Sequence, residues 1–182
     1  MKVAVYCSAK NVIPEEYLQL GDTLGTWLAQ HGHTLVYGGA TGGLMTRISN
    51  AVRSAGGYVI GVVPERVIQV GRLADNCNEL YKVPTMSNRK QKMKDLADCF
   101  VCLPGSYGTL DEMFDVIASG TVGEHNKPVF VVPCVSYVTG LNKVTVFILA
   151  IKVSLELGIH LAVIEIGAGE GVHRPFVDFP NV

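Results

Sequence analysis

Short apolar runs alternate with longer amphipathic stretches along this chain. Six runs have the length of a strand: residues 2–7, 34–37, 58–63, 99–103, 129–132 and 162–166. Because most of these runs are continuously apolar, they indicate a sheet that is covered on both faces. The stretches between them are long enough for helices. The alternation therefore predicts an α/β fold, a doubly wound, Rossmann-like parallel sheet with helices on both faces.

Two stretches between these runs have helical periodicity. In residues 14–31 the apolar side chains recur every three or four positions and form one face. This face carries Tyr17, Leu20, Leu24, Trp27 and Leu28. Pro14 suits the first turn of a helix, and Gly32 suits its end. A second apolar stripe lies in residues 44–55 and is followed by two glycines, so we expect a helix over each stretch.

Length and composition indicate one folded domain. The 182 residues suit a single domain with a substantial core, and 48% apolar residues exclude a disordered chain. We expect one Rossmann-like domain over residues 1–182, with an irregular C-terminal tail over residues 161–182 where periodicity is lost. A net charge of −1 argues against general binding to nucleic acid or to membrane surfaces.

Cysteine usage and the first residues predict a cytoplasmic protein. The five cysteines are an odd number, and three of them lie inside apolar runs, which is typical of reduced thiols. Residues 1–6 form a short predicted strand that polar residues follow, without a signal-peptide cleavage site. The apolar run at 144–153 is too short to span a membrane and carries Lys152.

The motifs of metal sites and dinucleotide sites are missing. Cys99 and Cys102 have the spacing of a metal-binding pair, but residues three apart on a strand point to opposite faces. The histidines have no metal-ligand spacing. The glycines of residues 38–43 do not satisfy GxGxxG, and no acidic residue ends the next predicted strand. We therefore expect no metal and no NAD.

The stretch from Leu103 to Glu112 carries the clearest chemistry. It follows a predicted strand, contains two glycines and leads into a helical pattern. A glycine turn before a helix forms an anion site, because free backbone N–H groups and the helix dipole face it. Glu112 then lies one turn inside the helix, beside the anion. Alternatively, Thr109 and Glu112 form a capping box with a structural role, and this motif alone does not decide between the two.

Other suggestive segments lie at the same edge of the predicted sheet, where doubly wound folds bind ligands. Residues 7–9 and 38–43 follow the first two strands. The glycines of 38–43 either allow contact with a phosphate or ribose, or only form a tight turn. A basic segment, residues 86–94, opens another predicted helix. Arg89 near its start either binds an anion through both guanidinium nitrogens or belongs to a solvated charged face.

Three segments together resemble the LOG family, the cytokinin riboside 5′-monophosphate phosphoribohydrolases that were long mislabelled lysine decarboxylases. The family segments YGGGxxGLM, MHxRK and PGGxGTxxE correspond to residues 37–45, 86–90 and 104–112 of this chain. Their order and spacing agree, and the likeness extends over about residues 1–133.

The resemblance implies an enzyme that hydrolyses the N-glycosidic bond of a purine nucleoside 5′-monophosphate, AMP or a cytokinin nucleotide. The products would be the free base and ribose 5-phosphate. It further implies a homodimer without metal or organic cofactor. The alternative is a non-catalytic protein on the same fold that binds a nucleotide or a ligand of the molybdenum-cofactor type. A carboxylate suits the hydrolase, since departure of the base builds positive charge on the ribose.

Matched by position, Arg89 and Glu112 correspond to the catalytic pair of the family, and the adjacent Asp111 is expected to point elsewhere. The resemblance assigns phosphate binding to Gly105, Ser106, Tyr107, Gly108 and Thr109. It assigns other nucleotide contacts to Ser8, Gly39, Met86 and Lys90. Ser106 replaces the second glycine of the family loop. If that position required a positive φ, serine would cost about 1 kcal/mol.

Overall fold

The computed structural model describes residues 1–132 and the strand at 161–163. The strands are β1 (Lys2–Tyr6), β2 (Thr34–Tyr37), β3 (Tyr58–Pro64), β4 (Glu79–Val83), β5 (Cys99–Cys102), β6 (Val129–Val131) and β7 (Leu161–Val163). The helices are α1 (Glu15–Gln30), α2 (Gly43–Ser54), α3 (Glu65–Gln69), α4 (Met86–Leu96) and α5 (Tyr107–Thr121). The predicted tail beyond residue 163 and the end of the last predicted strand lie outside the described residues.

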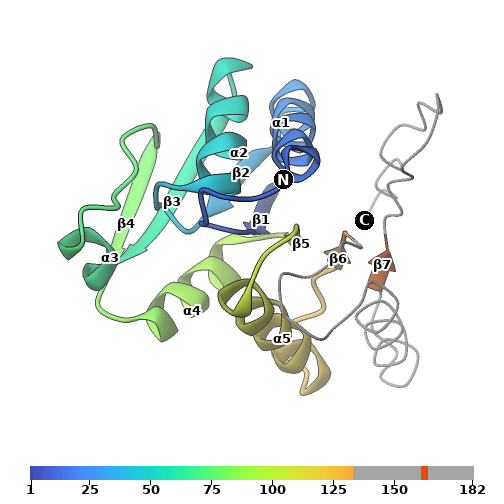
Figure 1. The fold of residues 1–182 in the computed structure, drawn as a ribbon. Coiled ribbons are helices and arrows are strands. Elements are labelled where there is room, and N and C mark those ends of the chain that lie inside the picture. The colour runs from blue at the N-terminus through green and yellow to red at the C-terminus, as the bar shows by residue number, and fades with distance from the viewer. Residues whose placement is uncertain (133–160, 164–182) are drawn as a thin grey trace.

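The seven strands of the described residues form one parallel sheet in the order β4-β3-β2-β1-β5-β6-β7. Helices α1 and α2 cover one face, and α4 and α5 cover the other (Figure 1). The fold is therefore the doubly wound α/β fold that the sequence predicts. From β1 the chain moves outward to β4 and then returns to β5 on the other side of β1, so the strand order reverses between β1 and β5.

The sequence prediction missed β4 and α3. Strand β4 lies at the edge of the sheet, where it pairs with β3 alone and has no fully buried residue. Its sequence mixes apolar and charged side chains, so a search for continuous apolar runs passes over it. Helix α3 has only five residues and buries none of them, which leaves no periodicity to detect.

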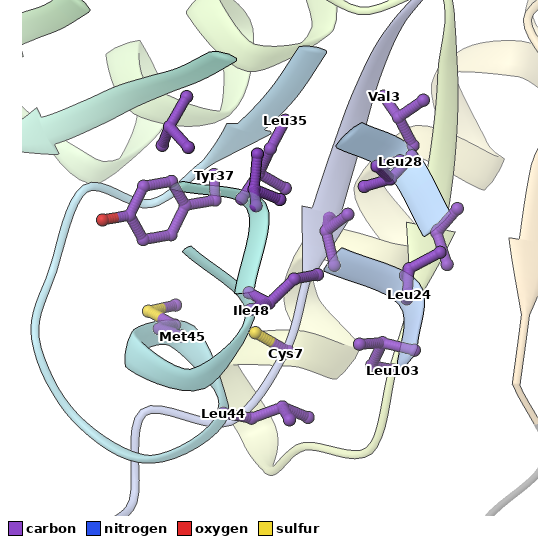
Figure 2. Close-up of a cluster of buried hydrophobic side chains, with 14 of the residues drawn as sticks. Val3, Cys7, Leu24, Leu28, Leu35, Tyr37, Leu44, Met45, Ile48 and Leu103 are labelled. Atoms are coloured by element: carbon purple, nitrogen blue, oxygen red, sulfur yellow. The ribbon is translucent and has the colours of Figure 1, made fainter. Parts of the chain in front are cut away.

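Each face of the sheet has its own apolar core. Under α1 and α2 lie Val3, Cys7, Leu24, Leu28, Leu35, Leu44, Ile48 and Leu103, among others (Figure 2). Under α4 and α5 lie Tyr6, Met93, Phe100, Met113, Val116 and Ile117, among others. Cys99 belongs to the first core and Cys102 to the second, so the two side chains lie on opposite faces of the sheet, as their spacing on a strand predicts. Burial raises the pKa of the Cys102 thiol to about 12.

Two glycines let α1 and α2 approach closely. A Cβ at Gly25 of α1 would lie 2.7 Å from the carbonyl oxygen of Ile48 and 2.8 Å from Cβ of Ala51. A Cβ at Gly21 would lie 2.5 Å from Cδ1 of Leu44. The backbone of α2 therefore packs directly on α1. This contact holds the beginning of α2 near the carboxyl end of β1.

Among the described helices, none is both long and apolar enough to cross a membrane.

We expect Gly25→Ala to destabilise the protein. Overpacking costs about 1–3 kcal/mol, which exceeds the stability of about 1 kcal/mol that alanine gains over glycine inside a helix. Urea unfolding should show a lower midpoint than wild type. Gln19→Ala, an exposed position on the same helix, is the matched control and should change little. A Gly25→Ala midpoint at or above that of wild type would show that the helices can separate without cost.

Candidate active site

The candidate site lies where the strand order reverses, at the carboxyl ends of β1 and β5. Ser8 follows β1 and is 2% exposed. Its backbone N–H donates to the carbonyl of Pro104 after β5 at 3.0 Å, and its carbonyl accepts from the N–H of Met45 in α2 at 3.2 Å. Ser8 thus connects three elements that are distant in the sequence, and this reversal point is where such folds bind ligands.

The loop between β5 and α5 has the form of an anion cradle. Among the described hydrogen bonds, the backbone N–H groups of Gly105, Ser106, Tyr107 and Gly108 have no acceptor. They precede or begin a helix of 15 residues, whose dipole adds partial positive charge at this end. Tyr107 and Gly108 are also exposed. A phosphate placed here would receive several backbone hydrogen bonds at once.

Ser106 is compatible with this loop. It is the N-cap residue of α5, with φ −105° and ψ −157°, an extended conformation that every residue adopts readily. The cost expected for a serine at positive φ therefore does not arise. The glycine requirement lies one residue earlier, since a Cβ at Gly105 would lie 2.0 Å from Oγ1 of Thr109. Thr109 packs against Gly105 and is only 7% exposed.

A buried ion pair joins α4 to α5 beneath the loops. Arg89 Nη2 contacts Glu112 Oε1, and the two residues are 6% and 3% exposed. Helix α4 begins at Met86, and the Oγ1 of its N-cap Thr85 accepts from the N–H of Asn88 at 3.2 Å. This cap fixes the first turn, which places Arg89 on the face that meets α5. The interpretation of Arg89 as part of a solvated charged face is wrong.

The capping-box interpretation of Glu112 is also wrong. The helix begins at Tyr107, so Thr109 is not its N-cap and Glu112 lies in the second turn. Its carboxylate faces Arg89 of α4 and is almost fully buried. Asp111 is 62% exposed in its side chain and pairs with Lys90, so it points away from Glu112 as expected.

The surroundings of Arg89 affect its pKa and its contacts. Burial lowers the pKa of Arg89, while Tyr6, Cys7 and Asp111 act in the opposite direction. Nε of Arg89 is buried and has no hydrogen-bond partner among the described residues. A Cβ at Gly38 would lie 3.1 Å from Nη1 of Arg89, so the glycine loop of residues 38–43 leaves room for the guanidinium. Arg89 thus retains hydrogen-bonding capacity beyond its ion pair with Glu112.

Comparison with known proteins shows which family the chain resembles. The family described as "Possible lysine decarboxylase" matches residues 45–153. A cytokinin riboside 5′-monophosphate phosphoribohydrolase of Mycobacterium tuberculosis is 39% identical over 140 residues, which cover 77% of this chain and 74% of that protein. The chain belongs to the LOG family.

Other relatives of this LOG-family chain show how far the likeness extends. The cytokinin riboside 5′-monophosphate phosphoribohydrolase LOG5 of Arabidopsis thaliana is 38% identical over 128 residues, which cover 70% of this chain and 56% of that protein. The solved structure of a molybdenum cofactor binding protein from Rippkaea orientalis has a TM-score of 0.67 at 19% identity and covers 88% of each chain. At that identity the likeness shows a shared fold.

Lys90 of the LOG segment is engaged in ion pairs between α4 and α5. Its Nζ lies 3.0 Å from Asp111 Oδ2 and 3.4 Å from Asp115 Oδ1, and Lys94 lies 3.0 Å from Asp115 Oδ2. Burial lowers the pKa of Lys90, but the hydrogen bond to Asp111 and the charge of Asp115 outweigh it and raise the pKa. Among the described contacts, no ion pair or hydrogen bond joins Lys90 to Arg89 or Glu112. The sequence analysis missed Asp115, although it lies four residues after Asp111 on the same helical face.

The first glycine loop of the LOG segment, residues 38–43, differs from the second in its hydrogen bonds. The N–H of Gly43 donates to Oδ1 of Asn11 at 3.1 Å, and the N–H of Gly42 donates to Oγ1 of Thr46 at 2.7 Å. Since the N–H of Met45 is also bound, the beginning of α2 has few free donors for an anion. Among the predicted nucleotide-binding residues, Gly39 lies in this loop with φ 61°, and Met86, 45% exposed, begins α4.

The described residues hold no group of three metal-ligating side chains. The site offers an anion cradle, a buried carboxylate and a buried guanidinium. The cradle and the ion pair share helix α5, since Gly108 and Glu112 lie about one turn apart on it. A ligand with a phosphate in the cradle can therefore extend toward the carboxylate.

We expect strong coupling between Arg89 and Glu112 in a double-mutant cycle of stability. Arg89→Met or Glu112→Leu alone leaves one buried charge unpaired, which costs about 3–5 kcal/mol. The double variant removes both charges and should recover much of that loss in urea unfolding. Lys90→Ala with Asp111→Ala removes an ion pair between the same helices in which the Asp111 side chain is 62% exposed, so it serves as the control and should couple by no more than about 1 kcal/mol. Additive losses at Arg89 and Glu112 would contradict the ion pair.

Proposed function

We propose that this protein hydrolyses the N-glycosidic bond of a purine nucleoside 5′-monophosphate, AMP or a cytokinin nucleotide, and releases the free base and ribose 5-phosphate. The observation that carries the proposal is the buried Arg89–Glu112 pair beside the free amides of the β5–α5 loop. The names of the relatives from Mycobacterium tuberculosis and Arabidopsis thaliana, which describe action on cytokinin riboside 5′-monophosphates, support it.

In the proposed complex the 5′-phosphate binds the N–H groups of residues 105–108 at the beginning of α5. Each hydrogen bond to a charged oxygen is stronger than one between neutral groups, and the helix dipole adds to the attraction. The phosphate fixes one end of the substrate, so the ribose extends from the cradle toward Glu112. Binding energy from this remote group then serves to position the reacting carbon.

In the proposed reaction the bond between ribose C1′ and the base nitrogen breaks, and its electron pair leaves with the base. Positive charge develops on C1′ and the ring oxygen, and the carboxylate of Glu112 stabilises it. Water adds its oxygen to C1′, while its proton is released through Glu112 and the departing base takes up a proton. Paired carboxyl groups perform the equivalent work in glycoside hydrolysis.

Arg89 serves this reaction by compensating the buried charge of Glu112 and fixing its orientation. Its remaining N–H groups, including the unpartnered Nε, can hydrogen bond to a hydroxyl or phosphate oxygen of the substrate. A guanidinium is suited to this double task, because its planar set of donors can hold a carboxylate on one side and a ligand on another.

We expect the protein to release free base and ribose 5-phosphate from AMP or isopentenyladenosine monophosphate. Glu112→Gln should slow release by about 100-fold or more, because the amide cannot stabilise the developing charge. Its nucleotide affinity should remain, since the phosphate cradle is unchanged. Chromatography of timed incubations measures release, and calorimetry measures binding.

Asp111→Asn is the matched control, because it removes the neighbouring carboxylate of the same helix, which is exposed and paired with Lys90. It should retain activity close to wild type. Full activity of Glu112→Gln would assign Glu112 a purely structural role. If wild type releases no base from either nucleotide, the protein would be a binding protein for a nucleotide or a ligand of the molybdenum-cofactor type, and mass spectrometry of the purified protein should then detect a bound ligand.

A further inference from the structure

Arg72, between α3 and β4, contacts two loops beside the ion pair. Its Nη2 donates to the carbonyl of Ala9 at 2.9 Å and to the carbonyl of Thr41 at 2.7 Å. Ala9 belongs to the loop after β1, and Thr41 belongs to the first glycine loop. We propose that Arg72 is a positioning residue, which holds both loops in the geometry that the Arg89–Glu112 pair requires. This inference rests on the proposed hydrolysis.

The backbone around Arg72 is attached to the first glycine loop. The N–H of Thr41 donates to the carbonyl of Arg72 at 2.8 Å, and the N–H of Ala74 donates to the carbonyl of Gly39 at 3.0 Å. Between these bonds, Ala40 and Leu73 form an antiparallel bridge. Residues 72–74 therefore run along residues 39–41, and this short ladder places the Arg72 side chain over the two loops.

The two loops meet backbone to backbone. A Cβ at Gly42 would lie 2.5 Å from the carbonyl oxygen of Ala9 and 2.7 Å from Nη2 of Arg72, and one at Gly43 would lie 2.0 Å from the carbonyl oxygen of Lys10. With no side chain between the loops, the carbonyls of Ala9 and Thr41 come within reach of one donor. The guanidinium of Arg72 satisfies both of them and bridges the junction.

The position of this junction affects Arg89. Gly38 begins the first glycine loop, and a Cβ there would already lie 3.1 Å from Nη1 of Arg89. At such packing, a small displacement of the loop changes the space available to the guanidinium. The phosphate cradle belongs to the β5–α5 loop, which Arg72 does not contact in any described hydrogen bond. Loss of Arg72 should therefore affect the chemical step more than nucleotide affinity.

The test compares Arg72→Met with Arg53→Met in steady-state hydrolysis. Arg53 is the matched control, because it is also exposed and donates to two acceptors, Gly57 and Asn78, at the end of α2 away from the site. Arg72→Met removes both hydrogen bonds, and kcat should fall about three- to tenfold, a change within the range of typical hydrogen-bond contributions. KM should change by less than about twofold. Arg53→Met should leave both constants unchanged.

Hydrogen exchange of residues 38–43 gives a second measurement that does not need turnover. The amides of this loop should exchange faster in Arg72→Met than in wild type or Arg53→Met. If wild type hydrolyses nucleotides and Arg72→Met keeps its kcat, or raises KM alone, the positioning role is wrong. If wild type shows no hydrolysis, the proposed function fails and with it the role of Arg72 in catalysis. Exchange then tests only whether Arg72 holds the loop: faster exchange in Arg72→Met supports this, and unchanged exchange overturns it.

Discussion

A guanidinium and a carboxylate are expensive to remove from water, and Arg89 and Glu112 are both almost fully buried. They are tolerated because each compensates the charge of the other. Several features of the fold make this contact possible. The cap at Thr85 sets the first turn of α4, the β5–α5 loop sets the beginning of α5, and the missing side chain at Gly38 leaves space above the guanidinium. The ion pair therefore restricts the positions of α4, of α5 and of the glycine loop that begins at Gly38.

The two glycine loops at this edge of the sheet look alike in sequence and differ in their hydrogen bonds. The amides at the beginning of α2 donate to the loop after β1, so the first glycine loop, residues 38–43, forms a wall of the site. The amides at the beginning of α5 have no acceptor among the described residues, so that loop is the one with donors for an anion. Glycine content alone does not distinguish these roles, because a close backbone approach and an open cradle both require small residues.

The parallel sheet and its long helices could be predicted because buried strands are apolar on both sides and amphipathic helices have a clear period. The edge strand β4 has neither signal. The pairing of Arg89 with Glu112 came only from the family resemblance, since residues far apart in the chain meet through the fold. The ion pairs of Lys90 and the contacts of Arg72 depend on side-chain directions at helix and loop ends, which local sequence does not specify.

The extended backbone of Ser106 bears on how this family can diversify. Since the position has no need for glycine, mutation can replace it without rebuilding the turn. Gly105 beside it is fixed by the packing of Thr109. A position that accepts a side chain thus adjoins one that does not, at the mouth of the cradle. A sequence pattern that requires two consecutive glycines in this loop would not match such chains. Because residue 106 carries a side chain, substitution at this position can change the contacts with the ligand.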